Sequence, residues 1–233
     1  TAAGLGAIYS EAVADATPGA DTIVNSMIAT DAVNADSIAA NAVGASELNV
    51  SGNGSSGNAL LSDGDGTFSW GTAGGIVQVK QVTIKDAYSY SGGSYQSMAV
   101  TGSITPTSSS NHILVMITLG RISNVGNNST TFKILRGGSN IIAGNSAGNR
   151  DLFSFSIRKI SSDGNHAQGG ISYTYLDSPN TTSSTTYTLQ GLSESGGTFY
   201  LNRSATDSNI SNNYNGRGAS TLIMMEVVGG IVT

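Results

Sequence analysis

A branched aliphatic residue recurs at every fifth position between Ile23 and Leu48. The repeating positions are Ile23, Ile28, Val33, Ile38, Val43 and Leu48, and a small polar residue stands two positions before each of them. A helix returns to one face every 3.6 residues and a strand every 2. A spacing of five therefore gives neither a helical stripe nor a one-sided strand, and it indicates a repeated bend-and-extend unit, as in a fibre or solenoid.

The repeat has six members, which is too few to bury a core within one chain, because a solenoid needs several complete coils. The simplest missing partner is another copy of the same chain. We therefore predict that residues 23–50 form the shaft of a fibrous homo-oligomer. A helix is the alternative for this segment, since alanine is abundant in it and favours helix.

The charge is divided unevenly along the 233 residues. Residues 1–79 contain no Lys or Arg and carry a net charge of −8, whereas residues 80–233 contain all 10 basic residues and carry +3. Such a break indicates two regions with different roles. A small positive charge scattered over the second region is not the footprint of a nucleic-acid-binding protein, so we expect no nucleic-acid partner.

Further function classes are excluded by what the sequence lacks. Cysteine is absent, which rules out disulfides, thiolate metal sites and a cysteine nucleophile. The longest apolar runs, such as residues 113–119, are too short to span a bilayer, so we expect no membrane insertion. The chain starts at Thr1 without the basic start of a signal peptide, which indicates a processed chain or part of a longer protein.

Composition divides the chain into four segments. Residues 1–22, rich in Ala and Gly, are interpreted as an N-terminal extension that continues an upstream shaft or anchors the protein. The shaft occupies residues 23–50, a Gly-rich neck residues 51–75, and a head residues 76–233. The different character of these segments predicts a fibrous part followed by a globular part.

The neck contains two turn dipeptides, Asp63-Gly64 and Asp65-Gly66, in which glycine accepts a positive φ. Its few bulky residues include Phe68 and Trp70. We expect a short hairpin here, with Phe68 and Trp70 packed at a chain–chain contact.

The head contains about nine apolar or alternating runs separated by Gly, Asn, Ser and Asp turns. Charged residues make up only 11% and aromatic residues 6% of the chain, which is typical of turn-rich β proteins when such runs are present. The expected strands are 76–85, 96–104, 112–120, 130–136, 151–159, 170–176, 185–192, 197–203 and 220–228. This pattern predicts an all-β fold, namely a jelly-roll-like β-sandwich.

Two motif matches conflict with their flanking sequence. Gly52–Gly57 matches G-x-G-x-x-G but lacks the strand before it and the helix after it that a dinucleotide site needs. Gly144–Gly148 matches G-x-S-x-G, but a strand pattern follows where a nucleophile elbow needs a helix. We interpret the first as neck and the second as a hairpin loop, and we expect no catalytic residue and no cofactor.

No metal site is expected. Asp63, Asp65 and Thr67 lack the remaining ligands of a calcium loop. His112 and His166 have no second histidine at ligand spacing; His112 is expected to open a strand and His166 to lie in a turn.

The carboxylates of the head also give no catalytic pattern. Most of them lie near turns, where Asp is common; the acids are Asp86, Asp151, Asp163, Asp177, Glu194, Asp207 and Glu226. Their scatter argues against the paired carboxylates of a glycoside hydrolase. Glu226 lies in an apolar strand where it could be buried, and a buried acid beside Arg or Lys is more often an assembly ion pair than a catalyst.

Tyrosines supply the candidate binding residues. Tyr88, Tyr90 and Tyr95 fall in a Gly/Ser-rich segment that we expect to be a loop, and Tyr214 falls in a second one rich in Asn and Gly. Tyrosine flanked by Ser, Gly and Asn is a common composition of adaptable binding surfaces, and loops at the end of a rigid sandwich suit recognition. Packing of these rings on neighbouring strands or subunits is the alternative.

Four stretches carry a resemblance to a known family. The run from Asn41 to Asn58, followed by Leu61–Trp70, resembles bacteriophage tail-fibre proteins, especially those of marine and cyanobacterial phages. The stretches 107–115 and 175–187 are similar to the β-rich terminal domain of phage fibres and related virion appendages. The resemblance extends over residues 25–230, and it has no catalytic signature.

The resemblance implies a homotrimer with a thin shaft and a distal β-sandwich head that contacts the host surface. The family has no single conserved receptor site, so no binding residue is transferred to this chain from the resemblance. We therefore expect an extracellular virion protein, not an enzyme, whose partners are its own copies, other virion proteins on the N-terminal side, and a host surface glycan or protein. The alternatives are a purely structural fibre, capsid decoration or tail-assembly protein, and a glycan depolymerase.

Overall fold

The computed structural model describes residues 50–229 except positions 51, 57, 66, 73, 126–127 and 159–167, together with Ile38, Val43 and Leu48. The N-terminal extension 1–22 and nearly all of the five-residue repeat lie outside the described residues, so the shaft stays a prediction. The chain divides into two units, Thr1–Gly71 and Thr72–Thr233. The predicted boundaries at residues 22, 50 and 75 also stay predictions.

A two-stranded hairpin makes up the described part of the neck, as the turn dipeptides predicted. Its strands are β1 (Asn58–Ser62) and β2 (Phe68–Thr72). The Trp70 indole donates a hydrogen bond of 2.8 Å to the Gly52 carbonyl, and a Cβ on Gly54 would lie 2.7 Å from the Trp70 ring. Trp70 therefore packs on its own neck, and the chain–chain contact expected for it and for Phe68 stays a prediction.

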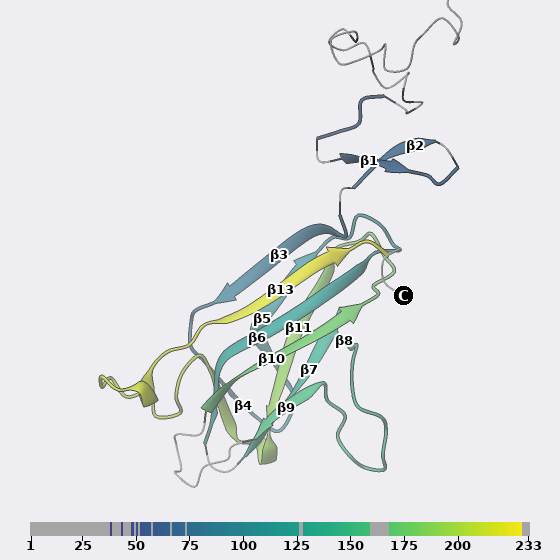
Figure 1. Cartoon of the computed structure of the whole chain (residues 1–233). Helices are drawn as coiled ribbons and strands as arrows, with labels where there is room; N and C mark the ends of the chain where they lie inside the picture. Colours follow the sequence, from purple (N-terminus) through teal and green to yellow (C-terminus); the bar gives the residue numbers. More distant parts are fainter. Residues whose placement is uncertain are drawn as a thin grey trace, which may run out of the picture. The chain divides into compact units, whose positions relative to one another are not determined.

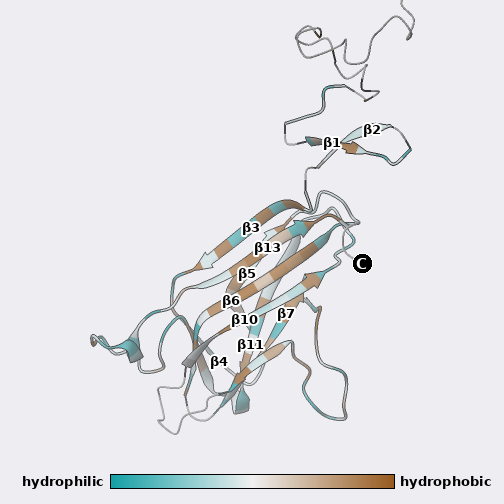
Figure 2. Cartoon of the chain, viewed as in Figure 1, coloured by the Kyte–Doolittle hydropathy of each residue, from teal (hydrophilic) through white to brown (hydrophobic). Residues whose placement is uncertain are grey.

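The second unit consists of two antiparallel sheets (Figure 1). In the first sheet, β13 and β12 both pair with one edge of β6, and β10 pairs with the other edge. Its strands are β3 (Ile76–Ile84), β4 (Tyr88–Ser91), β6 (His112–Asn124), β10 (Gln168–Asp177), β12 (Thr198–Leu201) and β13 (Ser220–Val227). Figure 2 shows apolar residues along much of β6, the strand in the middle of this sheet.

In the second sheet, β11 lies between β5 and β7, and β7 pairs on its other edge with both β8 and β9. The strands are β5 (Gln96–Ile104), β7 (Ser129–Arg136), β8 (Ser139–Asn140), β9 (Phe155–Arg158) and β11 (Thr185–Ser193). Two single-turn 3-10 helices, η3 (Glu194–Gly196) and η4 (Asn213–Asn215), are the other regular elements of the described residues.

Several short strands are collinear halves of longer rows. The strands β12 and β13 pair with successive stretches of β6, β4 and β3 pair with β12 and β13, and β9 and β8 share one edge of β7. The described residues of the second unit therefore form eight rows, which are arranged as 1-8-3-6 in the first sheet and 2-7-4-5 in the second when numbered along the chain. This is the strand order of a jelly roll, in which two Greek keys form a sandwich, as the sequence predicted for the head.

The core lies between the two sheets and includes a continuous chain of aromatic rings. The ring of Phe132 on β7 stacks on Phe155 at 4.9 Å and meets Phe199 of the opposite sheet edge-on at 6.2 Å. The chain extends through Tyr90 on one side and Tyr173 on the other. Offset and edge-on pairs of this kind add to the stabilisation that burial provides, so these rings join the sheets.

The observed strands agree with most of the expected ones, and two of the differences have a physical cause. The strand expected at 151–159 begins only at Phe155, because residues 141–154 form an excursion between β8 and β9. The segment 88–91, expected as a loop, is strand β4. Its Tyr-Ser-Tyr-Ser alternation has the strand period of two, which outweighs the serines and glycines around it.

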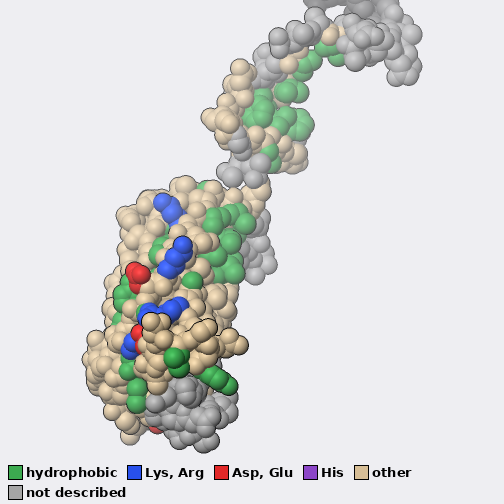
Figure 3. Space-filling model, turned by 90° about the vertical axis from the view of Figure 1, so that its left-hand side faces the viewer, with side chains coloured by type: hydrophobic (Ala, Val, Ile, Leu, Met, Phe, Trp, Pro, Cys, Tyr) green, Lys and Arg blue, Asp and Glu red, His purple; other side chains and the backbone are tan. Residues whose placement is uncertain are grey.

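The row formed by β12 and β13 is interrupted by residues 202–219, and Asn202 fixes the base of this insertion. Asn202 is buried, with φ at 61°, in the left-handed region that Asn tolerates better than most residues. Its side-chain amide donates to the carbonyls of Ile84 and Asp86 and accepts from Ser220. The insertion projects to the left in Figure 1, the side that Figure 3 turns toward the viewer.

Glu226 is buried, as the sequence suggested, and its hydrogen-bond partners are neutral. One carboxylate oxygen accepts from Thr107 and Asn111 and the other from Gln78, at distances of 2.6–2.8 Å. These donors come from the β5–β6 loop and from β3, and an ion pair of Glu226 within an assembly stays untested. Burial alone would raise the pKa of Glu226, but these hydrogen bonds outweigh it and hold the pKa below its ordinary value.

Replacing Phe132 with alanine should lower the free energy of unfolding by about 3–5 kcal/mol, because the ring is fully buried and its loss leaves a cavity. The measurement is urea denaturation at one fixed protein concentration. Phe68→Ala, the same change at a ring that is 41% exposed in the neck hairpin, is the control and should cost less than about 1 kcal/mol. Equal losses would contradict the assigned core.

The Glu226→Gln variant should be less stable than the natural protein by roughly 1–3 kcal/mol at pH 7, because the Gln amide faces the donor of Gln78. A carboxyl with a depressed folded-state pKa stabilises the fold fully above its unfolded pKa of about 4.3, and this contribution is lost as pH falls through the folded pKa. The difference between the two proteins should therefore shrink at pH 3. A difference that grows on acidification would show that burial raises this pKa.

Candidate functional site

Tyr88 and Tyr90 lie on β4 and pack partly against the core. The Tyr90 ring stacks on Phe199 at 5.0 Å, and its hydroxyl accepts a hydrogen bond from the Ala99 backbone at 2.9 Å. Burial raises the pKa of Tyr90, against the smaller effect of that bond. These contacts give both rings a structural role, and their predicted contact with a receptor stays a prediction.

Tyr95 and Tyr214 are placed differently. Tyr95 precedes β5, its hydroxyl lies 3.0 Å from that of Thr131, and the Lys133 ammonium lies 3.9 Å from the centre of its ring. Tyr214 belongs to η4 in the insertion 202–219 and is 60% exposed. The structure therefore does not gather the four tyrosines into one site, since Tyr95 and Tyr214 lie in separate connections.

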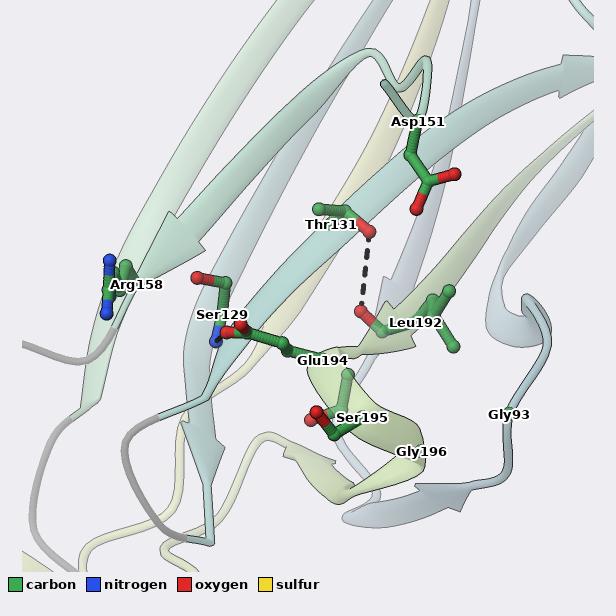
Figure 4. A pocket seen from close by; sticks show the side chains of 10 residues that line it. Gly93, Ser129, Thr131, Asp151, Arg158, Leu192, Glu194, Ser195 and Gly196 are labelled. Carbon is green, nitrogen blue, oxygen red and sulfur yellow. Dashed lines mark hydrogen bonds between the residues drawn. The ribbon is translucent and has the colours of Figure 1, made fainter. Parts of the chain in front are cut away.

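A cavity of about 510 Å³ lies beside Tyr95, and its lining combines charged side chains with hydroxyl groups (Figure 4). It is lined by Gly93, Ser129, Thr131, Asp151, Arg158, Leu192, Ser193, Glu194, Ser195 and Gly196. In Figure 1 these elements lie at the lower end of the sandwich, away from the end where Gly75 accepts a hydrogen bond from Val228. We call this cavity the end pocket.

The floor of the end pocket is the outer face of the second sheet. On β7, Thr130 and Phe132 are buried, so the intervening Thr131 points outward because side chains alternate along a strand. Its hydroxyl lies within 3.4 Å of the Leu192 carbonyl. The sheet thus presents hydroxyls at this end, fixed by strands that the core holds in place.

The wall is built by η3 and by the excursion before β9. Glu194 accepts a hydrogen bond of 3.1 Å from the Ser129 backbone, which ties η3 to the start of β7. Ser195 has φ at 57° and Gly196 at 70°, a tight left-handed turn. Figure 4 shows Asp151 and Arg158 at opposite sides of Glu194, so the pocket has two carboxylates, one guanidinium and several hydroxyls.

The charges of the pocket act on Tyr95 at its border. Burial raises the pKa of Tyr95, the hydrogen bond with Thr131 lowers it, and the negative charge of Asp151 raises it again. A neutral phenol, two carboxylate acceptors and an Arg donor can together satisfy the hydroxyls of a polar ligand. Bonds to the charged groups are the stronger ones, so Asp151, Glu194 and Arg158 dominate the chemistry.

These residues could not be assigned from the sequence. Asp151 and Glu194 were each found near a turn and were interpreted as scattered acids, and Arg158 carried no signal. They converge because β7 lies between β9 and β11 in the sheet. The order of the rows, which a single sequence does not reveal, creates the site.

The two motif segments lack the helix that each motif needs, where their residues are described. Gly52–Gly57 leads into a strand, and Gly144–Gly148 lies in an exposed connection. The interpretation of Gly144–Gly148 as a hairpin loop is wrong, because this connection joins β8 and β9, which pair with the same edge of β7 and not with each other. Asp63 and Asp65 accept hydrogen bonds from Thr67, which closes the turn of the neck. His112 opens β6 and bonds Ser178 at 2.8 Å, while His166 lies outside the described residues.

The part of the chain that the structure describes contains no group of three potential metal-ligating side chains. In the same residues, no helix is long and apolar enough to cross a membrane.

The outer face of the first sheet contrasts with the end pocket because it is apolar at one end. Strand alternation and register place Val79, Leu114, Met225 and Leu176 side by side across four rows. Val79 is 53% exposed, and the other three are half-buried. We call these four residues, with the neighbouring Ile76, Met116, Ile223 and Val227, the apolar outer face.

The comparisons with known proteins do not assign this chain to a family. No protein-family model matches it, and no curated protein matches it. Among solved structures it is similar to the crystal structure of the infectious bursal disease virus VP2 subviral particle, at 13% identity and a TM-score of 0.30, over 73% of this chain and 37% of that chain. A likeness at this level does not establish a shared fold or a shared role.

Proposed function

We propose that this chain is an extracellular virion protein of the phage-fibre type that attaches to the host cell surface. The end pocket is the observation that carries the proposal. It lies in a rigid jelly roll, at the end opposite to the one where the chain joins the sandwich, and it is lined by charged and hydroxyl groups. Loops on a rigid β scaffold are a common location for recognition sites.

The chemistry of the pocket favours a surface glycan over a protein as ligand. Carboxylates accept and guanidinium groups donate the hydrogen bonds that sugar hydroxyls need, and Asp151, Glu194 and Arg158 supply both kinds of group. Pockets for drug-like apolar ligands are lined mainly by hydrophobic side chains, whereas Leu192 is the one large apolar residue here. A single such site binds weakly, which agrees with a multivalent fibre.

We propose that the protein is a homotrimer, and the apolar outer face supports this assembly. Contiguous exposed apolar surface marks interaction sites in soluble proteins. The outer face of the other sheet is lined instead with paired hydroxyls, for example those of Thr101 and Thr188 at 2.8 Å. Three copies joined through the first sheet would leave the second sheets and their end pockets accessible and would multiply weak contacts to a repeated surface.

Two alternatives belong to other classes. A purely structural fibre, capsid decoration or tail-assembly protein would use the same trimer with other virion proteins on its N-terminal side and no receptor. A depolymerase is the second, because the fold brings the carboxylates of Asp151 and Glu194 into one pocket, as glycoside hydrolysis requires. We favour binding, since Glu194 is engaged with the Ser129 backbone.

The labelled 233-residue protein should bind saturably to marine or cyanobacterial host cells, and the binding should fall when surface polysaccharide is removed. Asp151→Asn and Glu194→Gln should each weaken binding about 10- to 100-fold, because a charge-assisted hydrogen bond is lost. Asp65→Asn in the neck hairpin removes the same charge elsewhere and should leave binding unchanged. A folded protein that binds no cell in the panel would favour the structural alternative, and release of reducing sugars would favour the depolymerase.

The protein of these 233 residues should have a mass in solution of three times the 23.6 kDa of one chain, measured by light scattering. Val79→Lys combined with Met225→Lys should reduce it to that of a monomer, because charges would be buried in the interface. Thr101→Lys combined with Thr188→Lys, on the outer face of the other sheet, is the matched control and should stay trimeric. A natural protein with the mass of one chain would contradict the trimer.

A further inference from the structure

The insertion 202–219 forms a second surface of defined shape, separate from the end pocket. Apart from Asn202 at its base, its own side chains hold it together. The Ser204 and Thr206 hydroxyls both donate to the Asn215 side-chain oxygen at 3.0 Å. The Asp207 backbone donates to the Ser204 hydroxyl, so the loop has a defined shape.

Three arginines contact this insertion, and two of them pair with one carboxylate. Arg203 and Arg217 each form an ion pair of 2.8 Å with Asp207. Arg121, from the adjacent β6, donates to the backbone carbonyls of Tyr214 and Gly216. Asp207 is the one acid within residues 202–219, so this arginine cluster carries a net charge of +2 in a chain whose total is −5.

The members of the arginine cluster have different tasks. Arg121 bonds the loop backbone, and the Arg203 guanidinium lies 4.2 Å from the centre of the Tyr200 ring, with its side chain only 20% exposed. Both are thereby held in place. The Arg217 side chain is 56% exposed and touches Asp207 through one terminal nitrogen, so the remaining donors of its planar fork face outward.

Exposed apolar groups accompany this charge. On the same insertion Ile210 is 59% and Tyr214 60% exposed. A sugar carries both polar groups and apolar C–H faces, and an aromatic side chain with a polar edge suits such a mixed surface. Figure 3 shows Lys and Arg side chains gathered on the side from which the insertion projects, which would draw an anionic polymer toward it.

We propose that the insertion 202–219 binds the carboxylate groups of acidic surface polysaccharide, with Arg217 as the principal contact and Tyr214 beside it. This inference rests on the proposed attachment function and assigns a second subsite to it. A planar carboxylate matches the fork of an arginine through two parallel hydrogen bonds, while the cluster's excess charge supplies attraction at longer range. The end pocket would then bind neutral hydroxyls and the insertion the acidic groups.

The test is retention of the 233-residue protein by immobilised polygalacturonate, with neutral dextran and dextran sulfate as comparison polymers. The natural protein should bind polygalacturonate more tightly than dextran, and rising salt should release it from polygalacturonate. Arg217→Gln should weaken binding about tenfold, since one charged contact is removed. Arg150→Gln removes the same charge from an exposed side chain in the connection before β9, which lines neither the end pocket nor the insertion, and should have no effect on binding of this polymer.

Asp207→Asn separates ligand binding from a merely structural role of the ion pairs. Asp207 has φ at 48°, which Asn tolerates well, and its removal raises the cluster's charge by one and releases both arginines. An anion site predicts several-fold tighter binding of polygalacturonate, whereas a role limited to holding the loop predicts weaker or unchanged binding. Unchanged or weaker binding overturns the proposal, as does retention by dextran sulfate alone.

Whole-cell binding keeps the two proposals distinguishable. If the natural protein binds cells and Arg217→Gln binds them equally well, attachment stands and the arginine subsite fails. If the natural protein binds no cell and still binds polygalacturonate with the expected variant pattern, the subsite stands and attachment fails.

Discussion

The pairing of β6 with three other strands is the interaction on which the rest of the sandwich depends. β6 is 13 residues long, and this length lets it pair along one edge with β13 and then β12 while β10 occupies the other edge. One side of β6 supplies Ile113, Val115, Ile117 and Leu119 to the core, all almost fully buried. A shorter central strand would leave the β4–β12 pair without its connection to the rest of the sheet, and would remove the support for the packing of Phe199 against Phe132.

Side chains alternate along every strand, so each sheet also has an outer face, and the two outer faces differ in polarity. On the first sheet, residues between the core positions of β6 and β13 are apolar at one end, among them Leu114 and Met225. On the second sheet, the equivalent positions carry hydroxyls, such as Ser103 facing Thr186 at 2.7 Å. Apolar surface is costly to leave in water and hydroxyl surface is not. This difference supports the separate roles that we propose for the two sheets, assembly for one and ligand contact for the other.

Local pattern was enough to predict the strands and the fold class, but not the site. The run 96–104 was found with its observed bounds, because its large apolar residues Met98, Val100 and Ile104 fall on one face of a strand with a period of two. The Tyr-Ser alternation at 88–91 was hidden by the glycines and serines that follow it. Asp151 and Glu194 are more than forty positions apart, and only the placement of β9 and β11 on either side of β7 brings them together. Sequence distance carries no information about such a contact.

Both proposed ligand surfaces come from breaks in rows of the jelly roll, and the two breaks carry different costs. The break between β8 and β9, which supplies Asp151, lies in an edge row, where unpaired backbone groups can reach water. The break between β12 and β13 lies in an inner row, where backbone groups without partners would be costly. Asn202 supplies hydrogen bonds at the place where the insertion leaves the sheet. Its backbone and side chain bond Arg121, Gly218, Ile84, Asp86 and Ser220. With the base closed in this way, the sequence of the insertion can vary without disturbing the core, which is what a surface that must match a changing host needs.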